Sequence, residues 1–225
     1  MIQLKNVSKF YYSKGMIASG ISKVNLTLDK GEFVVITGES GSGKTTLLNV
    51  ISGLDSYEEG EMYIDGKETS HYLASDFEEY RKQYIGNIFQ HFNLVNSYTV
   101  YQNVELILRI NGYSKADRKR RIAEILQRVG LAAYAKTKVS KLSGGQKQRV
   151  SIARALAKDT DIIVADEPTG NLDEKNGAQV SALLRELNRE LGMTMVVVTH
   201  NVELAAGLDR SLELRSGQLY EKTFA

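Results

Sequence analysis

Hydrophobic and polar residues alternate along the first third of the chain. Positions 2–7 are strand-like, positions 24–28 follow a strict period of two, and an uninterrupted apolar run occupies positions 33–36. A period of two is typical of a strand with one buried face, whereas a continuous apolar run is typical of a strand buried on both faces. Residues 62–64 are also strand-like and lead into Asp65-Gly66, a pair that favours a hairpin turn. We therefore expect mainly strands in this third.

The middle of the chain changes to the spacing of helices. Residues 100–110 place Val104, Ile107 and Leu108 on one face, which predicts an amphipathic helix. The segment that begins at Ser114 resembles a capping box, the pattern that opens a helix. The inner face expected for this second helix consists of Ile122, Ile125, Leu126 and Val129. The sequence therefore predicts a helical region here.

Strands and helices alternate in the last third. The apolar run 162–165 predicts a buried strand, and further strands are expected over 194–198 and 211–214. Between the first two lies a helix that stops at Gly192 and carries Val180, Leu183, Leu184, Leu187 and Leu191. Such alternation is typical of a parallel sheet covered by helices. The predicted fold is therefore α/β, with a mostly parallel sheet, an antiparallel β layer near the N-terminus and a helical insertion.

Composition narrows the class of protein only modestly. The chain has 225 residues, 42% of them hydrophobic and 25% charged, which fits one ordinary globular domain. A net charge of +2 is too small to indicate a nucleic-acid partner, so none is expected. The chain has no cysteine, which excludes disulfides and thiolate metal ligands. No apolar run approaches about 18 residues, so we expect any membrane role to depend on a partner.

A phosphate-binding loop is the first motif that carries chemistry. Residues 38–45 match G-x-x-x-x-G-K-[ST] between the strand 33–36 and an apolar run typical of a helix. Glycines let backbone N–H groups converge on phosphate oxygens, Lys44 adds a mobile cation, and the Thr45 hydroxyl suits Mg²⁺. A loop that merely turns a strand into a helix would not need this combination. The expected ATP ligands here are Gly38, Ser40, Gly41, Ser42, Gly43, Lys44, Thr45 and Thr46.

Polar residues that follow other strands complete a candidate site. Asp166 and Glu167 come directly after the run 162–165, at the edge where α/β sheets bind ligands. One carboxylate can hold Mg²⁺ through water while the next orients the attacking water. His200 follows the strand over 194–199, and Gln90 follows residues 85–89. Alone, either would be an ordinary structural residue; beside a phosphate loop, His200 is a candidate γ-phosphate contact and Gln90 a candidate metal ligand.

The segment Leu142-Ser143-Gly144-Gly145-Gln146 has the features of a second anion-binding helix terminus. It resembles the signature of ABC ATPases almost letter for letter. Further motifs occur in the order of that family over nearly the whole chain, from Tyr11 through the phosphate loop to His200. The resemblance implies the ABC ATPase fold, with a P-loop NTPase core. It also implies one domain over 1–225, divided into a core plus β subdomain at about 1–90 and 158–225 and a helical signature subdomain at about 91–157.

The resemblance also implies a role for each motif. Catalysis is expected from Glu167, His200, Lys44 and Asp166, and the metal site from Thr45, Gln90 and Asp166, the last through water. Tyr11, Gln90 and His200 are expected to join the phosphate loop in binding ATP, with Tyr11 stacked on adenine. For Tyr11, core packing and the adjacent Tyr12 remain alternatives. Ser143, Gly144, Gly145 and Gln146 are expected to bind ATP in trans, in a second copy, and Asp173 to lie in a dimer-contact loop. The expected cofactors are ATP and Mg²⁺.

Two segments narrow the resemblance further. Residues 88–94 and 166–173 resemble the group that contains macrolide exporters, lipoprotein-release ATPases and antimicrobial-peptide resistance pumps. Membership implies a bacterial homodimer at the cytoplasmic face of the membrane that drives efflux or extraction through a permease. The permease would have a large extracytoplasmic domain, and its coupling helix would dock near residues 91–103. Glu39 departs from the proline frequent in this group. The basic run 118–121 is more typical of a solvated helix face than of a patch that faces lipid or the permease. A non-transport ABC ATPase and a P-loop kinase or GTPase remain alternatives.

Overall fold

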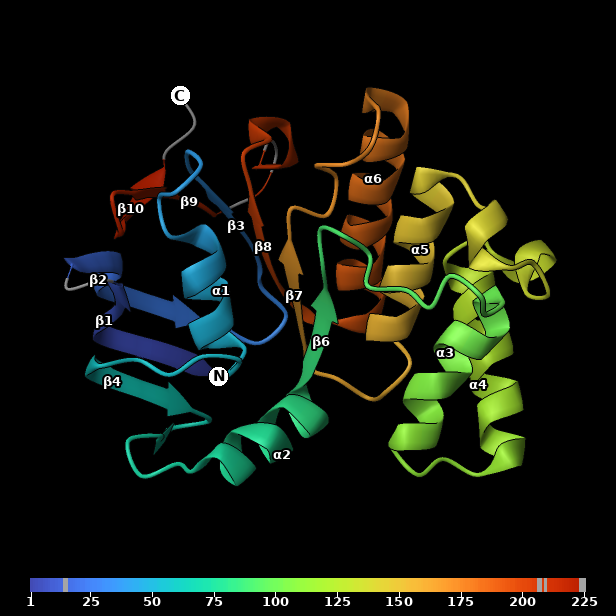
Figure 1. The fold of residues 1–225 in the computed structure, drawn as a ribbon, viewed down its shortest axis with the longest axis horizontal. Coiled ribbons are helices and arrows are strands. Elements are labelled where there is room, and N and C mark those ends of the chain that lie inside the picture. Colours follow the sequence, from blue (N-terminus) through green and yellow to red (C-terminus); the bar gives the residue numbers. More distant parts are fainter. Residues whose placement is uncertain (14–15, 206–207, 209, 223–225) are drawn as a thin grey trace.

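Two sheets with helices between and beside them make up the fold (Figure 1). The computed structural model describes residues 1–13, 16–205, 208 and 210–222. The first sheet is antiparallel, in the order β2-β1-β4-β5. Its strands are β1 (Ile2–Ser13), β2 (Met16–Leu28), β4 (Glu59–Ile64) and β5 (Lys67–Glu68). This sheet occupies the left of Figure 1, beside the first helix.

The second sheet is almost entirely parallel. Its order is β10-β9-β3-β8-β7-β6, and β10 alone runs antiparallel to its neighbour. The strands are β3 (Phe33–Thr37), β6 (Ile85–Ile88), β7 (Ile162–Asp166), β8 (Thr194–Thr199), β9 (Ser211–Arg215) and β10 (Gln218–Lys222). Because the parallel strands point the same way, their carboxyl ends share one edge, at the top of Figure 1.

Helices cover both faces of this sheet and extend to one side of it. The helices are α1 (Lys44–Ile51), α2 (Ala74–Tyr84), α3 (Val100–Ile110), α4 (Lys115–Arg128), α5 (Gly144–Ala155) and α6 (Glu174–Leu191), with short 3₁₀ turns η1 (Ala132–Tyr134), η2 (Val139–Lys141) and η3 (Val202–Ala205). Helix α1 lies on the side of the antiparallel sheet, whereas α5 and α6 lie on the other, with α3 and α4 beyond them (Figure 1).

The core divides into two clusters along the faces of the parallel sheet. In β3, Val34 and Ile36 pack with α1 and the antiparallel sheet, whereas Phe33 and Val35 pack with the helices on the opposite face. The alternation follows from the pleat of a strand, which points successive side chains to opposite faces. The second cluster also contains the buried residues of α3, α4 and α5, including Ile122. The helical region therefore shares its core with the sheet.

Most of the predicted elements are present, and several differ in extent. Strands β1 and β2 extend beyond the segments predicted for them. Irregularities in their pairing break the period of two, so the sequence pattern does not mark their full length. The sequence did not indicate α2, whose one buried residue in the helix is Tyr80, nor β6 and β10. Gly192 ends α6 in a left-handed conformation as predicted, but Leu191 is 39% exposed rather than buried. Ser114 caps α4, although its hydroxyl donates to Asp117 instead of forming the full capping box.

The basic run at the start of α4 is largely neutralised within the chain. Arg118 lies 3.3 Å from a Glu105 oxygen, and Arg121 lies 2.5 Å from an Asp159 oxygen. Arg120 lies 3.5 Å from an oxygen of Asp117 on the same helix. These pairs favour a helix face that is stabilised by its own chain over a free basic patch.

Asn103 joins α3 to the segment that precedes it, and its removal is expected to destabilise the fold. Its side chain is fully buried, accepts from the Val95 N–H at 2.9 Å and donates to the Val95 carbonyl at 3.1 Å. Asn103→Ala leaves these partly buried backbone groups of Val95 unpaired, so we expect a loss of about 1–3 kcal/mol in the free energy of unfolding. Urea denaturation measures it. The exposed Gln127→Ala on α4 is the control, expected to stay within about 0.5 kcal/mol, and an equally small effect of Asn103→Ala would contradict the prediction.

Candidate functional site

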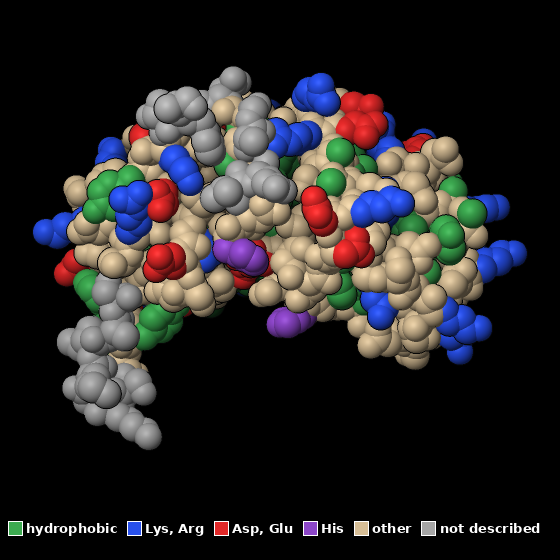
Figure 2. Space-filling model, turned by 90° about the horizontal axis from the view of Figure 1, so that it is seen from above, with side chains coloured by type: hydrophobic (Ala, Val, Ile, Leu, Met, Phe, Trp, Pro, Cys, Tyr) green, Lys and Arg blue, Asp and Glu red, His purple; other side chains and the backbone are tan. Residues whose placement is uncertain are grey.

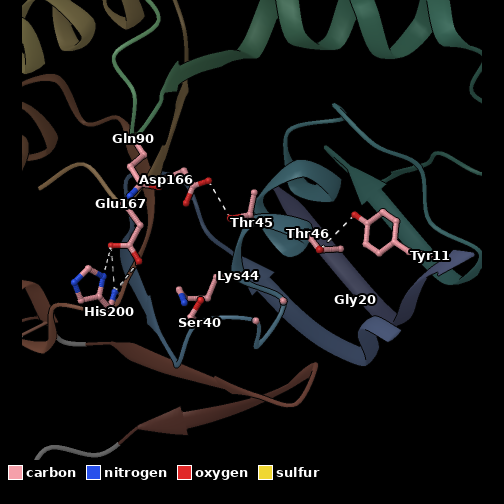
Figure 3. Close-up of a pocket in the computed structure, with 12 residues that line it drawn as sticks. Tyr11, Gly20, Ser40, Lys44, Thr45, Thr46, Gln90, Asp166, Glu167 and His200 are labelled. Atoms are coloured by element: carbon pink, nitrogen blue, oxygen red, sulfur yellow. Dashed lines mark hydrogen bonds and ion pairs between the residues drawn. The ribbon is translucent and has the colours of Figure 1, made fainter. Parts of the chain in front are cut away.

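The carboxyl edge of the parallel sheet opens into a pocket of about 490 Å³ (Figure 3). Strand β3 leads into the loop before α1, β7 ends at Asp166, and β8 is followed by His200. The residues that line the pocket are Tyr11, Gly20, Ser40, Gly41, Gly43, Lys44, Thr45, Thr46, Gln90, Asp166, Glu167 and His200. Figure 2 looks down on this edge, where histidine side chains lie near the middle of the face. Residues from far apart in the sequence therefore meet at one site.

The phosphate loop leaves the first turn of α1 open. Gly43 stands at the N-cap position with φ 104°, and no side chain accepts a hydrogen bond from the helix start. The first N–H groups of a helix have no acceptor within the helix, so this terminus presents free donors to the pocket. A Cβ on Gly43 would lie 2.0 Å from the Gly20 carbonyl oxygen of β2, which explains why glycine is required there. The loop therefore packs tightly on β2 while its donors face outward.

Lys44 reaches back over the phosphate loop. Its ammonium donates to the Gly38 carbonyl at 2.9 Å and to the Glu39 carbonyl at 2.8 Å. Gly38 and Ser42 do not line the pocket; they form the base of the loop, where the Ser42 hydroxyl is buried without a hydrogen-bond partner in the described structure. The Glu39 side chain is exposed and is also absent from the lining. The departure from proline at position 39 therefore leaves the open face of the loop unobstructed.

Thr45 and Asp166 meet across the pocket. The Thr45 hydroxyl donates to Asp166 Oδ2 at 3.0 Å (Figure 3). Burial raises the pKa of the Asp166 carboxyl above its usual range, and the Glu167 charge adds to this, while the Thr45 hydrogen bond and the Lys44 charge oppose it. A carboxylate that is costly to ionise in a buried position is stabilised by a cation beside it. The hydroxyl and carboxylate oxygens are also the ligand types that Mg²⁺ prefers.

Glu167 is held firmly by the end of β8. Its carboxylate accepts from the Thr199 hydroxyl at 2.9 Å and from the His200 N–H at 3.0 Å. The His200 ring nitrogen Nδ1 lies 2.9 Å from Glu167 Oε2 (Figure 3). The backbone of Glu167 is left-handed, with φ 45°, a conformation that non-glycine residues adopt rarely and often at functional sites. The Glu167 side chain is thus fixed at the pocket wall from three directions.

Gln90 and Asp173 belong to one connected surface. The Gln90 carbonyl accepts from the side chain of Asn171 at 2.8 Å, which ties the pocket wall to the loop before α6. Asp173 is the N-cap of α6 and accepts from the Asn176 N–H at 2.9 Å. This backbone hydrogen bond, with one from the Asn176 side chain, holds the pKa of Asp173 below its usual range. Asp173 therefore acts as a helix cap in the single chain and does not line the pocket.

Tyr11 lies at the far end of the pocket from Glu167. Its hydroxyl oxygen lies within hydrogen-bond distance of two side chains, 3.3 Å from Thr46 Oγ1 and 3.2 Å from Asp55 Oδ2. The side chain is 40% exposed, so Tyr11 is not a core residue, and the core-packing alternative is wrong. Tyr12 is 71% exposed and does not line the pocket.

The signature residues lie outside this pocket. Ser143 is the N-cap of α5 and forms a capping box with Gln146, because its hydroxyl accepts from the Gln146 N–H at 3.3 Å and its own N–H donates to the Gln146 side chain at 3.0 Å. Ser143 and Gly144 are exposed. A Cβ on Gly145 would lie 2.6 Å from the Asn176 side chain, which places the start of α5 against the start of α6. The signature and Asp173 therefore share one part of the surface.

Two residues at the site have no signal in the sequence. Gly20 lines the pocket on β2, where a Cβ would lie 2.8 Å from both Tyr11 and Thr46. Thr199 is fully buried and positions Glu167 through its hydroxyl. Neither belongs to a motif, and both were missed because their roles depend on contacts with distant parts of the chain.

The residues that line the pocket fit a nucleoside triphosphate and a divalent cation. The open N-terminus of α1 and the Lys44 ammonium form an anion-binding cradle. The oxygens of Thr45 and Asp166 are next to it. Among the described residues there is no group of three or more His, Cys, Asp or Glu side chains placed to hold a metal ion. In the same part of the chain, no helix has both the length and the apolar character needed to cross a bilayer.

Comparison with known proteins identifies the family. The family model described as ABC transporter matches residues 21–170. The uncharacterized ABC transporter ATP-binding protein MJ0796 of Methanocaldococcus jannaschii is 45% identical over 223 residues, covering 97% of this chain and 95% of that protein. The lipoprotein-releasing system ATP-binding protein LolD of Alcanivorax borkumensis is 42% identical, covering 97% of this chain and 96% of that protein.

Some relatives are much longer than this chain. The macrolide export ATP-binding/permease protein MacB of Mannheimia succiniciproducens is 40% identical over 99% of this chain, which spans only 34% of that protein. A solved structure described as a dimeric structure of MJ0796, a bacterial ABC transporter cassette, has a TM-score of 0.90 and 43% identity and covers 100% of this chain and 99% of that one. The predicted fold class is confirmed, and the chain belongs to the ABC transporter family, as an ATPase of the cassette fold.

Proposed function

We propose that this chain binds ATP and Mg²⁺ in the pocket beside Lys44 and hydrolyses ATP as a head-to-tail dimer. The observation that carries the proposal is the open helix terminus of α1 at the same sheet edge as Asp166 and Glu167. Support also comes from a relative solved as a dimer and in a post-hydrolysis state bound to ADP and Pi. The role of each residue below belongs to this proposal.

The phosphates bind at the loop and the base binds at Tyr11. Backbone N–H groups of residues 41–46 donate to phosphate oxygens, and Lys44 turns from the loop carbonyls toward the β- and γ-phosphates. The Tyr11 ring stacks on adenine, since its hydroxyl is already held by Thr46 and Asp55. Mg²⁺, when bound, neutralises phosphate charge that develops during the reaction. Thr45, Gln90 and Asp166 supply its oxygen ligands, Asp166 through water.

Glu167 orients and deprotonates the attacking water. The Thr199 hydroxyl and the His200 N–H fix one edge of its carboxylate, so that the group has a single orientation at the pocket wall. His200 turns from Glu167 toward the γ-phosphate when ATP is present. Phosphoryl transfer needs mainly positioning and charge stabilisation, so these fixed groups supply most of what the reaction requires.

The signature acts on the ATP bound by a second copy. Ser143 and Gly144 are exposed and do not line the pocket of their own chain. The N–H groups of Gly144 and Gly145 belong to the first turn of α5 and have no acceptor within the helix. With Gln146, they bind the γ-phosphate in trans, and Asp173 lies in the loop that contacts the second copy. Two chains therefore enclose two nucleotides.

A permease is the partner that we propose on the membrane side. The division at about 1–90, 91–157 and 158–225 separates the part that binds nucleotide from the helical part that carries the signature. A second pocket, of about 220 Å³, lies between them and is lined in part by Phe89, Phe92, Ile107 and Arg154. The Arg154 Nε atom is buried there without a hydrogen-bond partner. This pocket, beside residues 91–103, takes a cytoplasmic segment of the permease.

The transported substrate is proposed from the relatives. MacB is named for macrolide export and LolD for lipoprotein release. By analogy, this chain works at the cytoplasmic face of the membrane and drives efflux or extraction of an antimicrobial, a peptide or a lipoprotein. The permease, carried as a separate chain or as part of the same polypeptide, has a large extracytoplasmic domain. Co-purification with membrane proteins tests this part of the proposal.

Glu167→Gln is expected to stop turnover while preserving nucleotide binding. The substitution removes the proton acceptor but leaves the phosphate loop intact, so the steady-state rate of ATP hydrolysis falls about 100-fold, the scale of one positioned acid–base group. Fluorescent-ATP titration gives a Kd near that of the wild type, and size-exclusion chromatography detects an ATP-bound dimer. Glu79→Gln is the control, because Glu79 is an exposed side chain on α2. Near-normal hydrolysis by Glu167→Gln would contradict the role of Glu167 as the proton acceptor.

Ser143→Arg is expected to abolish ATP-driven dimerisation and to leave ATP binding by the monomer unchanged. The reason is that Ser143 lies outside the pocket of its own chain, so a bulky cation there obstructs only the contact in trans. Analytical ultracentrifugation with ATP, in the Glu167→Gln background, measures the dimer.

Ser114→Arg is the matched control for the Ser143 variant. Both serines are N-caps, with hydroxyls 3.3 and 3.2 Å from the N–H groups of Gln146 and Asp117 respectively. The two substitutions therefore remove comparable caps, but only one lies in the signature. Equal loss of dimer in both variants, or loss of monomer ATP binding in Ser143→Arg, would contradict the assignment in trans.

A further inference from the structure

The turn of the C-terminal hairpin lies against the phosphate loop. Strands β9 and β10 are joined by Ser216 and Gly217, both left-handed, with φ 46° and 79°. Figure 3 shows this hairpin running beneath the loop that carries Ser40 and Lys44. Strand β9 is also the parallel neighbour of β3, which leads into that loop. No residue of this hairpin is among those that line the pocket.

Gly217 forms one backbone hydrogen bond through its N–H and another through its carbonyl. Its N–H donates to the Ser42 carbonyl of the phosphate loop at 3.0 Å, and its carbonyl accepts from the Ser22 N–H of β2 at 2.8 Å. One residue therefore ties the loop to β2, the strand that also carries Gly20 of the pocket. Further back along the hairpin, the Leu214 carbonyl oxygen lies where a Cβ on Gly38 would come within 2.4 Å. The hairpin thus contacts the loop at its beginning and at its end.

The bond to Ser42 determines the direction of a phosphate donor. A trans peptide is planar, so the C=O of Ser42 and the N–H of Gly43 point in opposite directions. When the Ser42 carbonyl is held by Gly217, the Gly43 N–H is directed away from the hairpin. Gly43 lines the pocket with a left-handed φ of 104°. Because glycine has no side chain, nothing at this residue restrains the orientation of the peptide. The hairpin supplies the restraint that the glycine lacks.

We propose that Gly217 is a positioning residue for nucleotide binding, and that its N–H holds the Ser42–Gly43 peptide in the orientation that binds phosphate. The inference rests on the proposed ATP-binding function. Glycine is needed at position 217 for two reasons. Its φ is left-handed, and a Cβ there would lie 3.2 Å from the Ile21 Cα and 3.4 Å from the Ser22 nitrogen. A side chain there therefore crowds β2 and displaces the turn that carries the Gly217 N–H.

The chain contains a matched control for a purely structural role. Asp65 and Gly66 join β4 to β5 with φ 49° and 76°, nearly the values at Ser216 and Gly217. A Cβ on Gly66 would meet nothing within 4 Å, and its turn has no part in the pocket. Gly66→Ala and Gly217→Ala therefore impose the same left-handed alanine on two hairpins, of which one contacts the phosphate loop. Gly66→Ala measures the cost of the backbone conformation alone.

The test compares these two variants with the wild type. We expect Gly217→Ala to raise the Kd for Mg-ATP and the KM for hydrolysis by roughly 3- to 10-fold, the scale of one hydrogen bond, with little change in kcat at saturating ATP. Gly66→Ala is expected to bind and hydrolyse ATP as the wild type does. Thermal unfolding without nucleotide checks that both variants are folded. A wild-type Kd in folded Gly217→Ala, or equal weakening in both variants, overturns the inference.

Hydrogen exchange of the wild-type chain gives a second measurement that does not depend on a variant folding. If the Gly217 hydrogen bond favours binding, linkage requires that binding strengthens this hydrogen bond. Mg-ADP should then slow the exchange of the Gly217 amide more than that of the Gly66 amide. Equal slowing at both amides contradicts the inference. A wild-type chain that binds no ATP or ADP would instead overturn the proposed function itself.

Discussion

The shared register of three parallel strands is the constraint on which the site depends. Thr37 at the end of β3 pairs with Thr199 at the end of β8, and Asp166 at the end of β7 pairs with Val198. The strands therefore stop at nearly the same level, so the residues that follow them emerge side by side. This is why the phosphate loop that follows Gly38 lines one pocket together with Glu167 and His200, although the three are far apart in the sequence. These strands are buried on both faces, so a slip of one residue in a strand would exchange the side chains of its two core faces and misplace these groups.

The treatment of helix termini separates the nucleotide site from the rest of the fold. The N-caps of helices α3, α4, α5 and α6 are Thr99, Ser114, Ser143 and Asp173. Each of these side chains accepts a hydrogen bond from a backbone N–H in the first turn of its helix. Helix α1 begins at Gly43 and has no such cap. A capped terminus has satisfied part of its demand for an acceptor, whereas an open one gains most from a bound anion. The N-cap of α2 is Leu73, whose side chain forms no cap hydrogen bond either, but of these two helix starts only that of α1 lines the pocket.

The motifs were predictable because each depends on local order in the sequence. The phosphate loop, the carboxylates after β7 and the signature each lie within a few residues, and the family resemblance identified the fold. Helix α2 was not predictable in the same way, because Tyr80 is its one buried residue and its apolar period is too weak. Gly20, Thr199 and Gly217 were missed for a different reason: each acts through a partner distant in the sequence, on the neighbouring strand or loop, and no local pattern encodes such a contact.

The packing of α5 supports the proposal that a second chain completes the site. Val150, Ile152 and Ala153 of this helix are fully or almost fully buried, and they belong to the same core cluster as Val35 of β3. Movement of the signature toward the pocket of its own chain would expose this shared core, at about 25 cal/mol for each Å² of apolar surface returned to water. Docking the exposed end of α5 on another chain requires no such loss. The rigidity that fixes Glu167 and the phosphate loop thus favours completion of the site by association.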